Sequence, residues 1–231
     1  MKKRGTYFKK IREVQGLQGV FQYMQNNWSN IIELTFQHFQ LVSLAVVIAL
    51  LIGVPVGIYL TTNKPLAEVV LQICSIIMTI PSIALFGMMI PILSIINQGI
   101  GFLPALIALI LYSQLPIIRN TYVAINNVDP NMRDAAKGIG MTTWQRLRKV
   151  EIPIALPVIM AGIRTAVVLS IGIGAIAAFI GAGGLGVLID QGISRSNRDM
   201  VIVGALGVSL LAIIADTILG LIQRKITPKG V

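Results

Sequence analysis

Three stretches without a single charged side chain dominate this sequence. They run from Phe39 to Asn63, from Val69 to Ile118 and from Thr165 to Ile189. Each is longer than the roughly 20 apolar residues that span the hydrocarbon core of a bilayer. Because 55% of the 231 residues are hydrophobic and only 12% are charged, the chain lacks the polar surface that a soluble globule needs. The sequence therefore predicts an all-α integral membrane protein.

The distribution of charge argues against nucleic acid as a partner. The net charge is +10, but the basic residues gather at the two ends of the chain and around Asp134, beside apolar runs. That pattern is typical of membrane topology, so the expected surroundings are a lipid bilayer. His38 and Cys74 each stand alone, and we expect an interfacial side chain and a packed thiol. No cluster predicts a metal site or a catalytic group.

Residues 1–37 are interpreted as a basic N-terminus followed by an amphipathic helix. Six basic residues open the chain, and no apolar core of a signal peptide follows them. From Leu17 to Gln37, apolar residues recur every three or four positions among glutamines and asparagines. This spacing predicts a helix that lies along the membrane surface.

The apolar runs predict five spans, at about Phe39–Leu60, Ala67–Ile96, Phe102–Asn126, Ile154–Ile180 and Met200–Gln223. The second charge-free run holds two of them, because its fifty residues exceed one crossing and residues 97–101 form a turn-like interruption. The transmembrane domain then covers residues 38–224, and residues 225–231 form a cytoplasmic tail.

Two spans carry local features that bear on packing. Gly53 and Gly57 lie four residues apart around Pro55, a spacing that permits close helix contact, although glycine is also common in membrane helices for other reasons. Arg119 lies about 17 residues into the third span, so its side chain is expected to reach the far interface and anchor the helix end.

A proline with neighbouring hydroxyls interrupts the second span. Irregular backbone at membrane depth is tolerated where protein or a watery cavity satisfies it. The residues from Thr79 to Ser82 are therefore candidates to line a path, although such hydroxyls also bond the preceding helical turn. Mild hydroxyl groups would suffice for an uncharged or zwitterionic solute. The candidates for the path are Ser75, Thr79, Pro81, Ser82 and Ser170.

The fourth and fifth spans each hold one charge, Arg164 and Asp216. Counted from the helix ends, both lie roughly 12 to 15 Å from the same face of the membrane. An ionisable group at that depth is costly unless it is paired or hydrated. We expect an ion pair between them; the alternative is that one of them faces a solute path.

The polar loop at 128–153 is built as two short helices. Asp129 and Pro130 predict the first start, and Gly138 with Gly140 predicts its stop. A capping box from Thr142 to Gln145 opens a second helix, which is expected to end before Pro153. Small alanines leave an open face surrounded by positive charge, which suits a docking knob or an ordinary basic loop. The surrounding basic residues are Arg133, Lys137, Arg146, Arg148 and Lys149.

The arrangement Asp134-Ala135-Ala136, three residues, Gly140, nine residues, Val150-Glu151-Ile152-Pro153 resembles the signature loop of the membrane subunits of type I ABC importers. The family usually has Glu where Asp134 stands, and Ile-x-Leu-Pro at the end. These are conservative departures. The resemblance extends through four further motifs, which together look like the glycine betaine/carnitine/choline permeases. They are Thr79-Ile80-Pro81-Ser82-Ile83-Ala84-Leu85, Leu115-Pro116-Ile117-Ile118-Arg119-Asn120-Thr121-Tyr122, Pro157-Val158-Ile159-Met160-Ala161-Gly162-Ile163-Arg164-Thr165-Ala166 and Ile180-Gly181-Ala182-Gly183-Gly184-Leu185-Gly186.

That resemblance implies a five-span, methionine-permease-like core after the amphipathic helix, in a bacterial plasma membrane. The loop would couple to cytoplasmic ATPase subunits, which would bind ATP and magnesium. This chain has no Gly-x-x-x-x-Gly-Lys-Ser/Thr phosphate loop, and we expect neither a cofactor nor an enzymatic activity in it. The coupling residues would be Arg133, Asp134, Ala135, Ala136, Lys137, Gly140, Thr142 and Pro153.

The resemblance also implies two further partners: a second permease copy or paralogue, and an extracellular or periplasmic substrate-binding protein. The cargo would be a small osmoprotectant. Three alternatives stay open: an importer of another small solute such as a methionine-like amino acid, an exporter, and an ATP-independent carrier or channel.

Five spans and a cytoplasmic 128–153 loop place the N-terminus outside the cell. The basic N-terminal residues then violate the tendency of positive charge to stay inside. A re-entrant piece near Pro81 or Pro91, or the amphipathic segment, would restore the usual orientation. We expect five spans with the N-terminus outside.

Overall fold

The computed structural model describes residues 18–227, and every regular element in that range is helical. The basic residues 2–12 and the last four residues of the predicted tail lie outside the described part. A helical segment over residues 18–26 comes first. It is followed by α2 (Trp28–Leu60), α3 (Lys64–Thr79), α4 (Ser82–Ser94), α5 (Phe102–Asn126), α6 (Pro130–Gly138), α7 (Thr143–Arg146), the π-helical turn η1 (Leu147–Glu151), α8 (Ile152–Ile176), the 3-10 turn η2 (Ala177–Ile180), α9 (Gly186–Ser194) and α10 (Arg198–Ile226).

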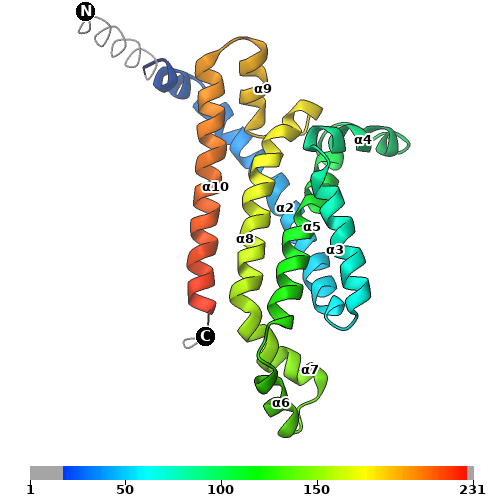
Figure 1. Cartoon of the computed structure of the whole chain (residues 1–231). Helices are drawn as coiled ribbons and strands as arrows, with labels where there is room; N and C mark the ends of the chain where they lie inside the picture. The colour runs from blue at the N-terminus through cyan, green and yellow to red at the C-terminus, as the bar shows by residue number, and fades with distance from the viewer. Residues whose placement is uncertain (1–17, 228–231) are drawn as a thin grey trace, which may run out of the picture.

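Five helices, α2, α3, α5, α8 and α10, run along the long axis of the molecule (Figure 1). Four of these segments are long and apolar enough to cross a membrane by themselves, and the bent pair α3 and α4 makes a fifth if it is counted as one broken span. The structure thus has four or five candidate spans, against the five predicted. The third predicted span has the same first and last residues as α5.

Helix α5 lies in the middle of the bundle, with α2 on one side and α8 on another. A Cβ atom at Gly57 of α2 would lie 2.7 Å from Thr121 Cβ of α5, and one at Gly162 of α8 would lie 2.5 Å from Asn120 Cβ. These glycines let the backbones approach closely, as small residues do between membrane helices. The close contact predicted at Gly53 and Gly57 is confirmed.

The second predicted span is not one straight helix. Between α3 and α4 the chain turns by 101° over two residues, Ile80 and Pro81. Proline has no backbone N–H and pushes the preceding residue into extended conformation, and Ile80 has φ −68° and ψ 128°. The hydroxyl of Tyr112 on α5 donates to the Ile80 carbonyl at 2.5 Å, so the freed acceptor is satisfied inside the protein. We call residues 79–82 the elbow.

The sequence predicts that a surface helix ends at Gln37 and that the first span begins directly after it. Helix α2 instead runs through this position without a break. The break lies instead at Asn27, and the 33 residues that follow form one helix. His38 is consequently not an interfacial side chain: it is 1% exposed, and its Nε2 lies 3.1 Å from the Ile171 carbonyl of α8. The packing of α2 against α8, which local sequence does not reveal, overrides the expected boundary.

The two ends of the molecule carry different elements. Helices α6 and α7 lie together at one end, and α9 lies at the other beside the beginnings of α2 and α10 (Figure 1). At the α9 end, the Gly101 N–H that precedes α5 donates to the Ile180 carbonyl of η2 at 2.8 Å. The turn after α4 is thereby joined to the end of the α8 segment. Residues 18–26 lie at the end opposite α6 (Figure 1), and the side of the membrane on which the N-terminus lies stays a prediction.

Candidate functional site

Helix α6 begins and ends by local sequence chemistry. The Asp129 carboxylate accepts a hydrogen bond from the Asn131 N–H at 2.9 Å, and Pro130 occupies the first turn. The helix stops at Gly140, whose φ of +80° suits a residue without a side chain. Gly138 is the last residue of the helix and has no positive φ, so only one of the two predicted stop glycines reverses the chain.

Helix α7 has the predicted capping box but does not end before Pro153. The Gln145 N–H donates to Thr142 Oγ1 at 3.3 Å, and the Thr142 N–H donates to Gln145 Oε1 at 2.9 Å. The chain then continues through η1 into α8, where Pro153, which has no N–H to donate, is the second residue and follows the π-helical turn. Residues 143–180 thus form one continuous helical stretch.

Glu151 joins the two short helices, and the sequence analysis missed it. Its side chain is 7% exposed, and its Oε1 accepts from Arg146 Nε at 2.7 Å and lies 3.5 Å from Arg133 Nε. Arg133 also donates to the Ile125 carbonyl at the end of α5. One signal was available: Glu151 is the only acid between Asp134 and Asp190. We call α6, α7 and η1 the docking head.

The two alanines of the signature differ in exposure. Ala136 is 4% exposed and packs inward, and its carbonyl accepts from the Met141 N–H at 3.1 Å. Ala135 is exposed. The open face predicted for both alanines therefore belongs to Ala135 alone.

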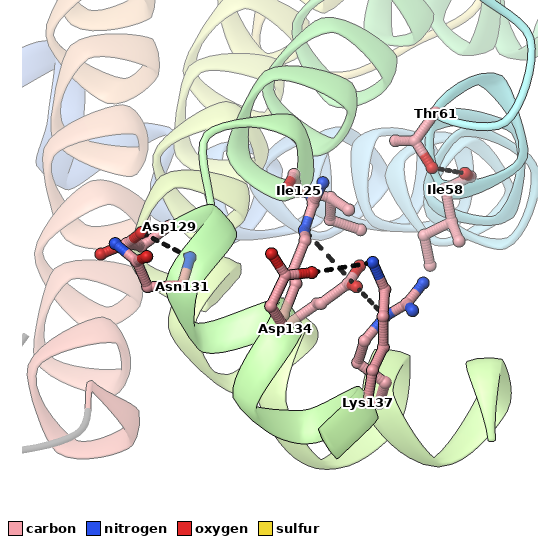
Figure 2. A network of polar contacts seen from close by, with 10 residues as sticks. Ile58, Thr61, Ile125, Asp129, Asn131, Asp134 and Lys137 are labelled. Atoms are coloured by element: carbon pink, nitrogen blue, oxygen red, sulfur yellow. Dashed lines mark hydrogen bonds and ion pairs between the residues drawn. The ribbon is translucent and has the colours of Figure 1, made fainter. Parts of the chain in front are cut away.

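Asp134 forms an exposed ion pair with Lys137, 2.9 Å away and one turn along α6. Figure 2 shows the two side chains facing each other, with Asp129 at the beginning of the helix. The hydrogen bond from Lys137, together with its charge, lowers the pKa of Asp134 below its ordinary value. The carboxylate stays ionised at neutral pH, so the docking head carries a fixed charge pair.

Apolar side chains on the docking head complete its surface. Met132, Ile139 and Trp144 are 48%, 75% and 65% exposed. They lie in and beside α6 and α7, among the basic residues that the sequence analysis identified. Large exposed apolar groups with a charged rim are typical of protein contact sites. Single apolar residues in a polar loop gave no sequence signal of this surface.

The structure brings Arg164 and Asp216 together as a bidentate pair between α8 and α10. Arg164 Nε donates to Oδ1 and Nη2 to Oδ2, each at 2.8 Å. Gln223 Oε1 accepts from Arg164 Nη1 at 3.0 Å, and the guanidinium lies over Gly220, where a Cβ would be 3.4 Å from Arg164 Cζ. The helices are joined by a network rather than by two charges alone.

The five candidate path residues do not gather in one place. Thr79, Pro81 and Ser82 lie at the elbow and Ser75 one turn before it, while Ser170 is 1% exposed and its Oγ lies 2.9 Å from Ser113 Oγ of α5. Thr79 is exposed, and its hydroxyl donates to the Ile76 carbonyl at 2.7 Å. Ser170 thus holds two helices together in this conformation.

The family described as the inner membrane component of binding-protein-dependent transport systems matches residues 51–228. This range includes the docking head, the elbow and the ion pair. The chain belongs to this family. The permease is a multi-pass component of the inner membrane, and its role is transport.

Curated relatives match the permease over nearly their whole length. It is 56% identical to the osmoprotectant import permease protein OsmW of Salmonella typhimurium, over 90% of this chain and 97% of the relative. It is 43% identical to the glycine betaine/carnitine/choline transport system permease protein OpuCB of Bacillus subtilis, over 90% of this chain and 94% of the relative.

The fold of the permease is that of type I ABC importer membrane subunits. A solved inward-facing structure of the MetNI methionine ABC transporter superposes with a TM-score of 0.78, covering 89% of this chain and 98% of that one. The two are 24% identical, so the likeness concerns the fold. The predicted methionine-permease-like architecture is confirmed. Within residues 18–227 no group of acidic, histidine or cysteine side chains could hold a metal ion.

Proposed function

We propose that this permease carries a small osmoprotectant such as glycine betaine, carnitine or choline into a bacterial cell as part of an ATP-driven importer. The observation that carries the proposal is the docking head, whose α7 continues into α8 as one helical stretch. Such a connection converts a push on the head into motion of a membrane span. The names of the relatives supply the class of solute.

The partner that pushes would be a cytoplasmic ATPase subunit, which would bind ATP and magnesium. Met132, Ile139 and Trp144 would enter its surface, and the basic residues around them would meet acidic groups. The exposed contacts would come from Asp134, Ala135, Lys137 and Thr142. Arg133 and Ala136 would hold the head from inside, Gly140 would form its turn, and Pro153 would lie where the head joins α8.

A second permease subunit, identical or paralogous, would complete the path. Helix α5 fills the middle of this bundle, with Ala108, Leu109 and Thr121 at 0% exposure. One subunit therefore offers a wall rather than a pore. An extracellular binding protein would deliver the solute at the α9 end, opposite the docking head.

Uptake into vesicles tests the proposal. The permease is reconstituted with its ATPase and its binding protein, and accumulation of radiolabelled glycine betaine, carnitine, choline and methionine is measured. We expect ATP-dependent accumulation of at least one quaternary ammonium solute and little methionine. Accumulation without ATP would indicate a carrier or channel. Preferential uptake of methionine would indicate an importer of a different solute, and ATP-driven movement of solute in the opposite direction would indicate an exporter.

A further inference from the structure

Helix α5 has one side that neither α2, α3 nor α8 covers. It contacts α2 through Ile117 and α8 through Asn120, and Ile118 packs in a cluster with Ala67 of α3. At about 100° per residue, Arg119 lies about 200° around the helix from Ile117. Arg119 therefore occupies the interval between α3 and α8, opposite α2, and its side chain is exposed.

The outer half of this side of α5 is closed by α4. Phe86 of α4 is 0% exposed and packs in one cluster with Ala108 and Tyr112. Tyr112 precedes Arg119 by two helical turns, or about 10 Å, on the same side of α5. The side is thus covered toward the α9 end. Below Tyr112 it opens toward the docking head, where Val123 is 39% exposed.

Helix α3 contributes a polar stripe beside Arg119. Gln72, Ser75 and Thr79 follow one another at helical spacing, and they lie between about 100° (Ser75) and about 160° (Gln72) around α3 from Cys74, which packs with Ala67 in the cluster that α3 shares with α5. Because α3 and α5 are antiparallel right-handed helices, this flank of α3 faces the same way as Arg119. The exposed flank of α3 that adjoins this stripe is apolar. It consists of Val69, Ile73 and Ile76.

Arg119 needs water or an anion on this side. It lies seven residues, or about 10 Å, inside the end of α5, and it forms no ion pair with any group in residues 18–227. Intramembrane charges usually face a bundle interior or a water-filled cavity, and they mark the paths of substrates. A polar stripe on the neighbouring helix has the same requirement. The two features together define one hydrated face.

We propose that this face, formed by Gln72, Ser75 and Thr79 of α3 with Arg119 of α5, is the permease's wall of the solute path, and that Arg119 binds the carboxylate of the passing solute. The proposal rests on the proposed function. A guanidinium matches a carboxylate with two parallel hydrogen bonds. Glycine betaine and carnitine carry a carboxylate, whereas choline carries only a hydroxyl, so Arg119 distinguishes the two classes.

Thiol accessibility tests which side is hydrated. In a Cys74→Ala permease within the assembled transporter, Gln72→Cys is compared with its neighbour Ile73→Cys in inside-out membranes. A small hydrophilic methanethiosulfonate should modify Gln72→Cys at least about 10-fold faster, because Ile73 lies about 100° away on the apolar flank. Equal rates, or a faster reaction at Ile73→Cys, would overturn the assignment of the wall.

Solute preference tests the role of Arg119. We expect Arg119→Gln to lower the transport efficiency for glycine betaine and carnitine by about 10-fold, the loss of one charged hydrogen-bond pair, and choline uptake by less than 2-fold. Arg119→Lys should recover part of the loss. The control is Arg224→Gln at the exposed end of α10, which should leave the preference unchanged.

The outcomes separate this proposal from the proposed function. If Arg119→Gln changes all solutes equally, or behaves like Arg224→Gln, Arg119 only anchors the helix among lipid headgroups and the proposal fails while the importer stands. A wild-type complex that transports choline but neither carboxylate-bearing solute also overturns it. If the wild-type transporter accepts only carboxylate-bearing solutes, the comparison with choline is replaced by two results. A loss of uptake of about 10-fold in Arg119→Gln with partial recovery in Arg119→Lys supports the proposal, and any other result contradicts it. Absence of ATP-driven uptake refutes both.

Discussion

Glu151 is the residue on which the shape of the docking head depends. One of its two carboxylate oxygens, Oε1, faces arginines from both α6 and α7, and one of these arginines also reaches the end of α5. A buried acid between two basic groups leaves both cations without a partner when it is removed. The position of α6 relative to α8 therefore depends on one charge.

Neutralising that charge should loosen the head while leaving its size unchanged. We expect Glu151→Gln to cost about 2 kcal/mol of unfolding free energy, since charged hydrogen bonds are replaced by neutral ones. Thermal unfolding of the purified transporter measures this loss, and solute moved per ATP hydrolysed should fall with it. Glu33→Gln, which changes an exposed acid at the other end, is the control. Equal unfolding midpoints for the two variants would contradict the role of Glu151.

The two glycines at the end of α6 and just after it offer two contrasting substitutions. Gly140 has a φ of +80°, so Gly140→Val should cost about 1–2 kcal/mol and displace α7 relative to α6. Gly138 ends the helix with open space around it, so Gly138→Ala should be neutral or slightly stabilising. We expect only the first variant to uncouple ATP hydrolysis from transport. Normal coupling in Gly140→Val would show that the turn has no part in it.

At the scale of the helices, α8 and α10 are joined by the network around Arg164. Asp216 binds the guanidinium from one side and Gln223 from another, and Gln223 Nε2 donates to the Pro157 carbonyl at 2.8 Å. The side chains of Arg164 and Asp216 are 32% and 41% exposed, so water or headgroups weaken the pair. We therefore expect the ion pair to contribute little to the free energy of unfolding. Its larger effect should be to fix the position of α8 relative to α10.

A double-mutant cycle measures that energy. Unfolding free energies of Arg164→Gln, Asp216→Asn and the double variant should show a favourable coupling between the two positions, because the effects of contacting residues are not additive. The double variant should then be more stable than the sum of the single losses predicts. Additive losses would mean that the two residues act separately, and transport assays of the single variants would then locate the one that matters.

The helices differ in how far sequence could predict them. The first and last residues of α5 agree with the predicted span because its ends are set by residues next to them in sequence, namely Gly101 and the polar residues after Asn126. The elbow does not follow from local rules, because Pro81 predicts a break but not its direction. The 101° turn depends on Tyr112 and Phe86 meeting across the fold. For the same reason η1 was missed, since Pro153 can end a helix or occupy its first turn.

At the scale of the whole molecule, the predicted topology puts three spans between residues 18–26 and the docking head, so these two segments should lie on opposite sides of the membrane. The helical segment 18–26, which includes the exposed Gln25, lies at the end of the molecule opposite α6, which ends at Gly138 (Figure 1). In a Cys74→Ala permease, an impermeant maleimide added to intact cells should therefore label Gln25→Cys and not Gly138→Cys. Inside-out vesicles should give the reverse. Labelling of both from one side would contradict the five-span topology.

The site was predictable to the extent that its groups are neighbours in sequence. The capping box, the cap at Asp129 and the signature alanines lie within one short segment. Three other features could not be predicted without knowing how distant helices pack: the burial of Ala136, the contacts of Glu151 and the position of Arg119. The pairing of Arg164 with Asp216 is the exception, because helix geometry alone gave both charges the same depth.

Within the continuous stretch from Thr143 to Ile180, Gly162 packs against Asn120 of α5, nineteen residues from the first residue of the stretch and eighteen from its last. A tilt about that contact would move the two ends of the stretch by similar distances in opposite directions. The outer end carries the Gly101 turn with it through the Ile180 carbonyl. If two permeases assemble as proposed, a tilt that draws their inner ends together would spread their outer ends.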